Sequence, residues 1–127
     1  MESGYRATVK LQQIWHATEM SMDSSKQNAI DEFIKRAVQS YGDQIQSITL
    51  FGSVARGTDR PDSDIDLLVV VDREDFRLRR ELIGLTFDIL LETGEDISVK
   101  VLSQDDFEAK KSFSFLSNVL SEGIKIA

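Results

Sequence analysis

The stretch of sequence that decides the fold covers residues 52–71. It reads Gly52-Ser53-Val54-Ala55-Arg56-Gly57-Thr58-Asp59-Arg60-Pro61-Asp62-Ser63-Asp64-Ile65-Asp66-Leu67-Leu68-Val69-Val70-Val71. The part from Asp64 to Val71 predicts a strand, and its unbroken apolar run indicates burial on both faces. Upstream, residues 45–51 read as a second strand that ends abruptly at Gly52-Ser53. Between the two strands there is room for one helical turn and a polar loop.

The segments on either side predict helices and one further strand. Residues 24–41 carry apolar side chains at helical spacing, with Ser24 or Ser25 as a cap and Gly42 as the stop. Residues 74–91 predict a second helix and residues 96–102 a third strand, in which Ile97, Val99 and Val101 share one face. Ser103 can cap a last helical region, which can break near residues 110–111 and resume to residue 123. This order predicts a small α/β (α+β) domain, with helices packed on a small mixed sheet.

The length and composition limit what the chain can be. Its 127 residues fit one domain, which we place at residues 25–127, with residues 1–24 as an N-terminal extension of unknown role. A net charge of −7 argues against stable nucleic-acid binding by this chain alone. The absence of cysteine and the single histidine, His16, exclude thiolate and histidine-cluster metal sites. No apolar run could span a membrane and no secretory leader is recognisable, so we expect a cytoplasmic protein.

The helix predicted at residues 74–91 has two apolar stripes instead of one. The first consists of Leu78, Leu82, Leu85 and Ile89, and the second of Phe76, Ile83, Phe87 and Leu90. One stripe is enough to cover a sheet, so the second must meet something else. The sequence leaves two partners open for it: the C-terminal helix of the same chain, or another chain in a homo- or hetero-oligomer.

The chemistry-bearing residues are Asp64 and Asp66, with Gly52 and Ser53 upstream. Residues two apart on a strand project from the same face, and two carboxylates entering a buried strand repel each other. A divalent cation would compensate them, although both could also lie in solvent or cap turns. The glycine lets the backbone approach a ligand, and Ser53 can cap the helical turn while facing an anion. The pattern therefore indicates a phosphate cradle beside a metal-binding pair, and it matches neither a serine-nucleophile elbow nor a P-loop.

Gly52-Ser53, ten intervening residues and Asp64-x-Asp66 resemble the signature of the DNA polymerase β-like nucleotidyltransferase superfamily. The fuller strings, Gly-Ser-Val-Ala-Arg-Gly and Asp-Ser-Asp-Ile-Asp-Leu-Leu-Val, resemble its minimal nucleotidyltransferases. These are small proteins often paired with HEPN-domain partners in toxin–antitoxin modules. The resemblance covers about residues 26–123 and implies the polymerase β-like nucleotidyltransferase core.

The resemblance also implies a set of site residues. Asp64 and Asp66 would bind two Mg²⁺ ions, with Mn²⁺ as an alternative, and a third carboxylate would come from the next strand. Asp96 matches that position, Asp88 is a poorer candidate, and Glu95 is the fallback if the strand register differs by one residue. The resemblance further implies that Gly52, Ser53 and Arg56 bind the phosphates of the nucleotide.

The implied reaction is the transfer of AMP from ATP to a hydroxyl group. Because the chain has little room beyond the catalytic core, the acceptor is expected on another chain, namely a HEPN-type toxin that the protein would neutralise as an antitoxin. Two alternatives stay open. One is a non-catalytic, nucleotide-binding antitoxin that acts by binding alone, and the other is the catalytic subunit of a small-molecule or RNA nucleotidyltransferase.

Overall fold

The computed structural model describes residues 24–127, so His16 and all of the predicted extension except Ser24 lie outside the described residues. The chain forms, in order, α2 (Ser24–Tyr41), the 3-10 turn η2 (Gly42–Gln44), β1 (Ile45–Phe51), α3 (Gly52–Arg56), β2 (Ile65–Val71), α4 (Phe76–Thr93), β3 (Ile97–Ser103), α5 (Gln104–Lys110), α6 (Ser114–Glu122) and β4 (Ile124–Lys125).

The four strands form one mixed sheet in the order β3-β2-β1-β4. Strand β1 runs antiparallel to β2 and β4, whereas β2 and β3 are parallel and are joined through α4. The predicted fold class is confirmed. Strand β4 was not predicted, because two residues that pair with Thr49 and Leu50 are too short to show a period.

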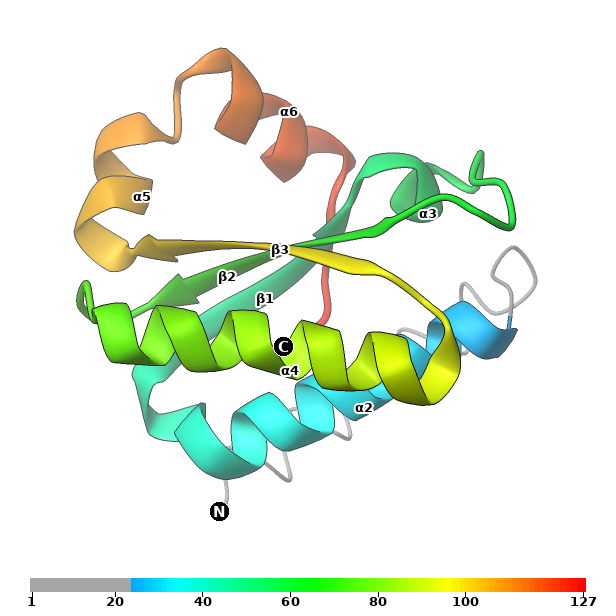
Figure 1. The fold of residues 1–127 in the computed structure, drawn as a ribbon. Coiled ribbons are helices and arrows are strands. Elements are labelled where there is room, and N and C mark those ends of the chain that lie inside the picture. Colours follow the sequence, from blue (N-terminus) through cyan, green and yellow to red (C-terminus); the bar gives the residue numbers. More distant parts are fainter. Residues whose placement is uncertain (1–23) are drawn as a thin grey trace.

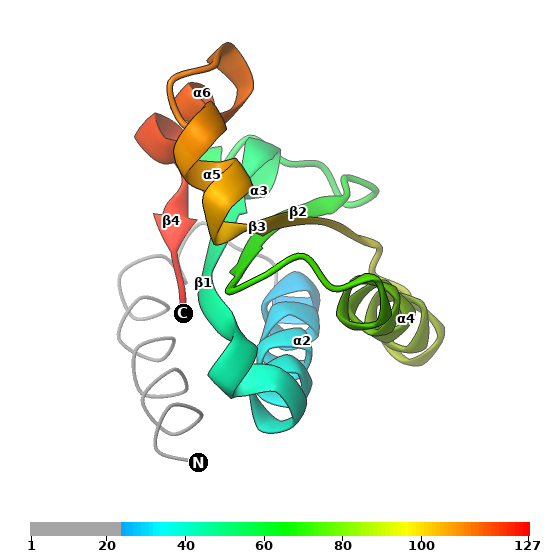
Figure 2. The same ribbon diagram turned by 90° about the vertical axis from the view of Figure 1, so that its left-hand side faces the viewer.

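Helices cover both faces of the sheet (Figures 1 and 2). Leu67 and Val69 of β2 belong to a core with α2 and α4, whereas Leu68 and Val70 pack with α6. Since alternate side chains of a strand point to opposite faces, β2 must be apolar from Leu67 to Val71, beyond Asp66. The expectation that this strand is buried on both faces is confirmed.

Helix α4 begins two residues later than predicted, because the Asp75 side chain caps it by accepting from the backbone N–H groups of Arg77 and Leu78. Leu78, Leu82 and Ile89 of its first stripe are buried. The second stripe does not pack on the C-terminal helix, since Phe76 and Phe87 remain exposed and α6 lies on the opposite face of the sheet (Figure 2). The alternative in which the second stripe packs on the C-terminal helix was therefore wrong.

Within residues 24–127, no helix is long and apolar enough to cross a membrane.

Candidate active site

Gly52 and the acidic pair meet where β1 ends and β2 begins. Phe51, the last residue of β1, pairs with Asp66, so the next residue, Gly52, lies directly against the Asp66 side chain. A Cβ atom on Gly52 would overlap Asp66 Oδ2 and lie 3.1 Å from its Cγ. Gly52 also has a φ of +76°, which favours glycine. Only a residue without a side chain fits here, and it brings the start of α3 into contact with the carboxylate.

Asp66 is half-buried and lies among charged groups. Burial raises the pKa of its carboxyl above the ordinary value of 3.8, and the Asp64 carboxylate raises it further. The charges of Lys100 and Arg56 act in the opposite direction. The structure therefore brings Asp64, Asp66 and Arg56 close together, and it adds Lys100, which the sequence did not single out. Lys100 could have been found from the alternation of residues 96–102, which places its side chain on the same side as that of Asp96, the residue before β3.

A fully buried lysine holds the loop that leads into the acidic pair. Lys26, near the start of α2, is 0% exposed, and its Nζ lies 2.8 Å from Asp59 Oδ2. The same ammonium donates to the backbone carbonyl of Arg60. The loop is closed further by Ser63, whose N–H donates to the Arg60 carbonyl at 2.9 Å. The burial of Lys26 was not predicted, because a lysine on an amphipathic helix is normally solvated.

The three candidates for the third carboxylate of the site, Asp96, Glu95 and Asp88, lie in different places. Asp66 pairs with Ser98, and continuing this register by two residues towards the start of the strands sets Asp96 level with Asp64. Asp96 is exposed, and its carbonyl accepts from the Ile65 N–H at 2.9 Å. Glu95 points to α2, where Ser25 Oγ donates to its Oε2 at 2.9 Å. Asp88 is exposed on α4, which covers the other face of the sheet.

The predicted phosphate-binding residues adjoin the acidic pair, with one difference from expectation. Helix α3 starts at Gly52 with Phe51 as its N-cap and without a side-chain cap bond, so the expectation that Ser53 caps the turn was wrong. The Ser53 carbonyl instead accepts from the N–H of Thr58 at 3.0 Å. Arg56 is exposed and its Nη1 lies 3.1 Å from Glu122 Oε2 of α6.

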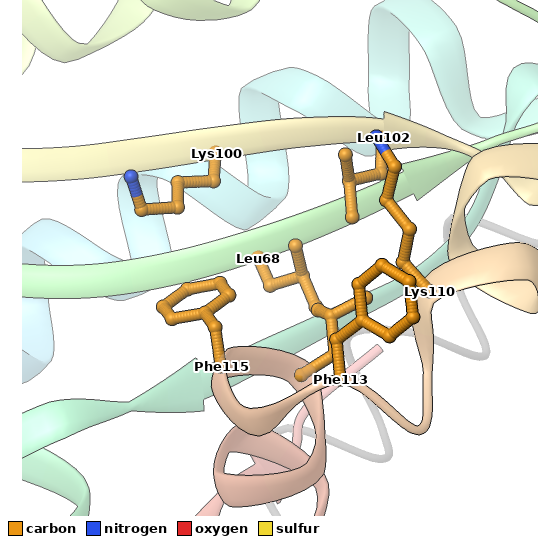
Figure 3. A pocket seen from close by; sticks show the side chains of 7 residues that line it. Leu68, Lys100, Leu102, Lys110, Phe113 and Phe115 are labelled. Carbon is orange, nitrogen blue, oxygen red and sulfur yellow. The ribbon is translucent and has the colours of Figure 1, made fainter.

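An apolar cavity of about 350 Å³ opens beside this site, between β2, β3 and the segment leading into α6. Lys100 and Phe115 face each other across it, with the Lys100 ammonium 5.6 Å from the ring centroid (Figure 3). The Phe115 ring also meets Phe51 edge to face at 5.7 Å between centroids. Since Phe51 directly precedes Gly52, the cavity adjoins the site. Its apolar walls and lysine rim suit a flat apolar group that also carries negative charge.

The donor set of the site fits a hard divalent cation. Two neighbouring carboxylates supply oxygen ligands, and Mg²⁺ is commonly held by one or two carboxylates together with water and substrate phosphates. Among residues 24–127, no three histidine, aspartate or glutamate side chains lie close enough together to hold one ion. The Asp96 carboxylate is thus not gathered into one cluster with Asp64 and Asp66.

Comparison with known proteins gives the class to which this fold and site belong. The family model described as "Nucleotidyltransferase domain" matches residues 30–126. The chain is 40% identical over 99 residues to "Putative protein adenylyltransferase MJ0604" of Methanocaldococcus jannaschii, covering 78% of this chain and 95% of that protein. It is 32% identical over 102 residues to "Putative protein adenylyltransferase MJ1305" of the same organism, covering 78% and 69%.

A crystal structure described as a toxin-antitoxin with AMP-PNP also matches, with 26% identity and a TM-score of 0.49, over 75% of this chain and 70% of that one. The family match and the two archaeal relatives decide the class. The chain belongs to the nucleotidyltransferase domain family, and the protein is a nucleotidyltransferase.

Proposed function

We propose that this protein transfers AMP from ATP to a hydroxyl group of a partner protein in a reaction that depends on a divalent metal ion. The observation that carries the proposal is the contact between Gly52 and the Asp66 carboxylate, with Asp64 beside it. This contact brings a backbone suited to triphosphate binding next to a pair of carboxylates suited to a cation.

In the proposed reaction, the acceptor oxygen forms a bond to the α-phosphorus of ATP. The bond from that phosphorus to the oxygen of the β-phosphate breaks, and pyrophosphate leaves. Asp64 and Asp66 would hold Mg²⁺ or Mn²⁺, and a second ion would need the Asp96 carboxylate as a further ligand. Bound ions would stabilise the charge on the attacking and leaving oxygens. Asp96, exposed and level with Asp64, takes the proton from the acceptor hydroxyl.

Backbone N–H groups of Gly52 and Ser53 hold the β- and γ-phosphates in this proposal. Arg56 adds a further contact by exchanging Glu122 for a phosphate oxygen. Both side chains of that ion pair are about half exposed, at 48% and 46%. Such surface pairs contribute little stability, so the exchange costs little.

The names of the two archaeal relatives support a protein as the acceptor. The resemblance of residues 52–57 and 62–69 to minimal nucleotidyltransferases supports a HEPN-type toxin as that protein and an antitoxin role for this one. The alternative of neutralisation by binding alone predicts no covalent change in the partner, so a transfer experiment distinguishes it from AMP transfer.

Metal-dependent nucleotide binding is the first test. Calorimetric titration should show ATP binding in the presence of Mg²⁺ and a large loss of affinity in a chelator. Asp64→Asn and Asp66→Asn should weaken binding while circular dichroism shows an unchanged fold. Asp43→Asn, which changes an exposed carboxylate of η2, is the matched control. Equal affinity with and without metal would contradict metal dependence.

Transfer is the second test. The product of the neighbouring gene, incubated with this protein, ATP and Mg²⁺, should gain about 329 Da for each AMP added, as phosphoryl-transfer chemistry requires. Mass spectrometry measures the gain, and Asp66→Ala should abolish it. If Asp66→Ala neutralises the partner as well as the wild type and no mass is gained, the binding-only alternative is correct.

A further inference from the structure

Helix α4 carries a second apolar face that no other described residue covers. The large side chains on it are Phe76, Ile83, Phe87 and Leu91, which are 76%, 39%, 61% and 86% exposed. At about 100° per residue, they fall with Arg80 and Gly84 in one arc opposite the buried stripe. The helix lies at the margin of the fold (Figure 2). Single exposed apolar residues are ordinary, but four on one face of one helix indicate an interaction site.

We propose that this face, Phe76, Arg80, Ile83, Gly84, Phe87 and Leu91, binds the same face of a second copy of this chain. The two α4 helices would pack antiparallel about a two-fold axis that passes between Ile83 and Gly84. The inference concerns oligomerisation and stands independently of the transfer reaction.

The spacing of the residues along α4 is symmetric about this axis. Phe76 precedes Ile83 by seven residues, and Leu91 follows Gly84 by seven. An antiparallel pair therefore sets Phe76 of one copy against Leu91 of the other, at both ends of the contact. A two-fold interface requires that a surface complement itself in this way.

The centre of the face allows a close approach of two helices. Gly84 has no side chain, and nothing lies within 4 Å of the position that a Cβ would occupy. Arg80 precedes Ile83 by three residues and Phe87 follows Gly84 by three, so each Arg80 meets the Phe87 ring of the other copy. A guanidinium over an aromatic ring is a favourable contact, and here it forms twice.

The charges beside the face support a second copy over a partner of uniform charge. The first half of α4 exposes Arg77 and Arg80, and the second half exposes Asp88 together with Glu92, which already pairs with Arg36 of the same chain. Antiparallel packing sets the basic half of one copy against the acidic half of the other, whereas parallel packing would set like charges together. The helix is therefore complementary to itself in one orientation.

The interface would be small. One pair of 18-residue helices buries less than the roughly 1,200 Å² of a standard stable complex. We therefore expect a reversible dimer whose population rises with protein concentration. Sedimentation velocity of the full chain from about 5 μM to about 500 μM covers the range expected for weak association. Phe87→Glu should raise the dissociation constant at least tenfold, whereas Phe113→Glu, at a residue 62% exposed outside α4, should leave it unchanged.

The chain has no cysteine, so a single introduced cysteine reports its own symmetric contact. Gly84→Cys should give a covalent dimer on mild oxidation, because a disulfide needs Cα atoms about 4.4–6.8 Å apart and the axis passes beside this residue. Leu120→Cys, at an exposed position on α6, should cross-link much more slowly. A wild type that stays monomeric at every concentration would overturn the proposal and would indicate that this face binds a different protein. A dimer that Phe87→Glu does not weaken would overturn it as well.

Discussion

At Asp66, burial and a neighbouring carboxylate both act against the charged form that metal binding needs. The folded-state pKa is raised, so below the ordinary value of 3.8 both folded and unfolded states are protonated and stability is complete. As the pH rises from 3.8 through the folded-state pKa, the unfolded chain releases this proton more readily than the native carboxyl does, and stability falls. At neutral pH without metal, an ionisable carboxyl at position 66 therefore makes the fold less stable than a neutral side chain would.

Asp66→Asn should consequently raise the melting temperature at pH 7 in a chelator. The gain should disappear at pH 3, where the wild-type carboxyl is already neutral. Thermal denaturation followed by circular dichroism at both pH values measures this, with Asp43→Asn as the control. Mg²⁺ should stabilise the wild type and leave Asp66→Asn unchanged. A lower melting temperature for Asp66→Asn than for the wild type at pH 7 would show that the Asp66 carboxyl does not destabilise the metal-free fold.

Asp96 directly precedes β3, and Ser98 lies two residues further along the chain. Variants at these two positions distinguish the proposed base from a neighbouring residue. Asp96→Asn should leave ATP affinity within a few-fold and lower AMP transfer by orders of magnitude, because the acceptor proton then has no base. Ser98→Ala, beside Asp66 in the register, should change transfer little. Calorimetry and mass spectrometry give the two readouts. Near-normal transfer by Asp96→Asn would remove Asp96 from the site.

At the scale of helices and strands, sequence patterns predicted the features that depend on neighbouring residues in the chain. The amphipathic spacing of α2, the buried run of β2 and the Ser103 cap, which accepts from the Asp106 N–H, are set within a few residues. Strand β4, the contact of Gly52 with Asp66 and the burial of Lys26 join distant segments. No short window of sequence contains such contacts, and they decide the geometry of the site.

The contact between α2 and the loop before β2 is one of these long-range connections. Lys26→Met should destabilise the protein by about 3–5 kcal/mol, because it leaves Asp59 without its buried cation. It should also weaken ATP–Mg²⁺ binding by the protein that remains folded, since the loop no longer holds Asp64 in place. Urea denaturation and calorimetry below the melting temperature measure the two effects.

Arg36→Met provides the matched control on the same helix. It breaks the pair in which Arg36 Nη2 lies 2.6 Å from Glu92 Oε1, and Glu92 is about half exposed. This change should cost about 0–1 kcal/mol and leave nucleotide binding unaltered. If Lys26→Met loses stability but binds ATP–Mg²⁺ as well as the wild type, Lys26 has a structural role alone.

At the scale of the whole molecule, residues near the end of the chain close the same core that α2 begins. Ile126 is 0% exposed and belongs to one cluster with Ile30, Leu67 and Leu82. Its N–H donates to the Ile48 carbonyl at 2.8 Å, and the Ile48 N–H donates to the Ala127 carbonyl at 3.1 Å. Segments from both ends of the described chain therefore share one hydrophobic core, which should make unfolding cooperative.

Ile126→Ala should lower the free energy of unfolding by about 2–5 kcal/mol, the usual cost of emptying a buried isoleucine site. Because α2 and β2 share this core, circular dichroism and hydrogen exchange of α2 amides should report one transition at the same lower temperature. Leu120→Ala, at a side chain 50% exposed on α6, should change stability by less than about 0.5 kcal/mol. Two separate transitions in Ile126→Ala, with α2 retained after the sheet has melted, would show that the two ends of the chain do not form one folding unit.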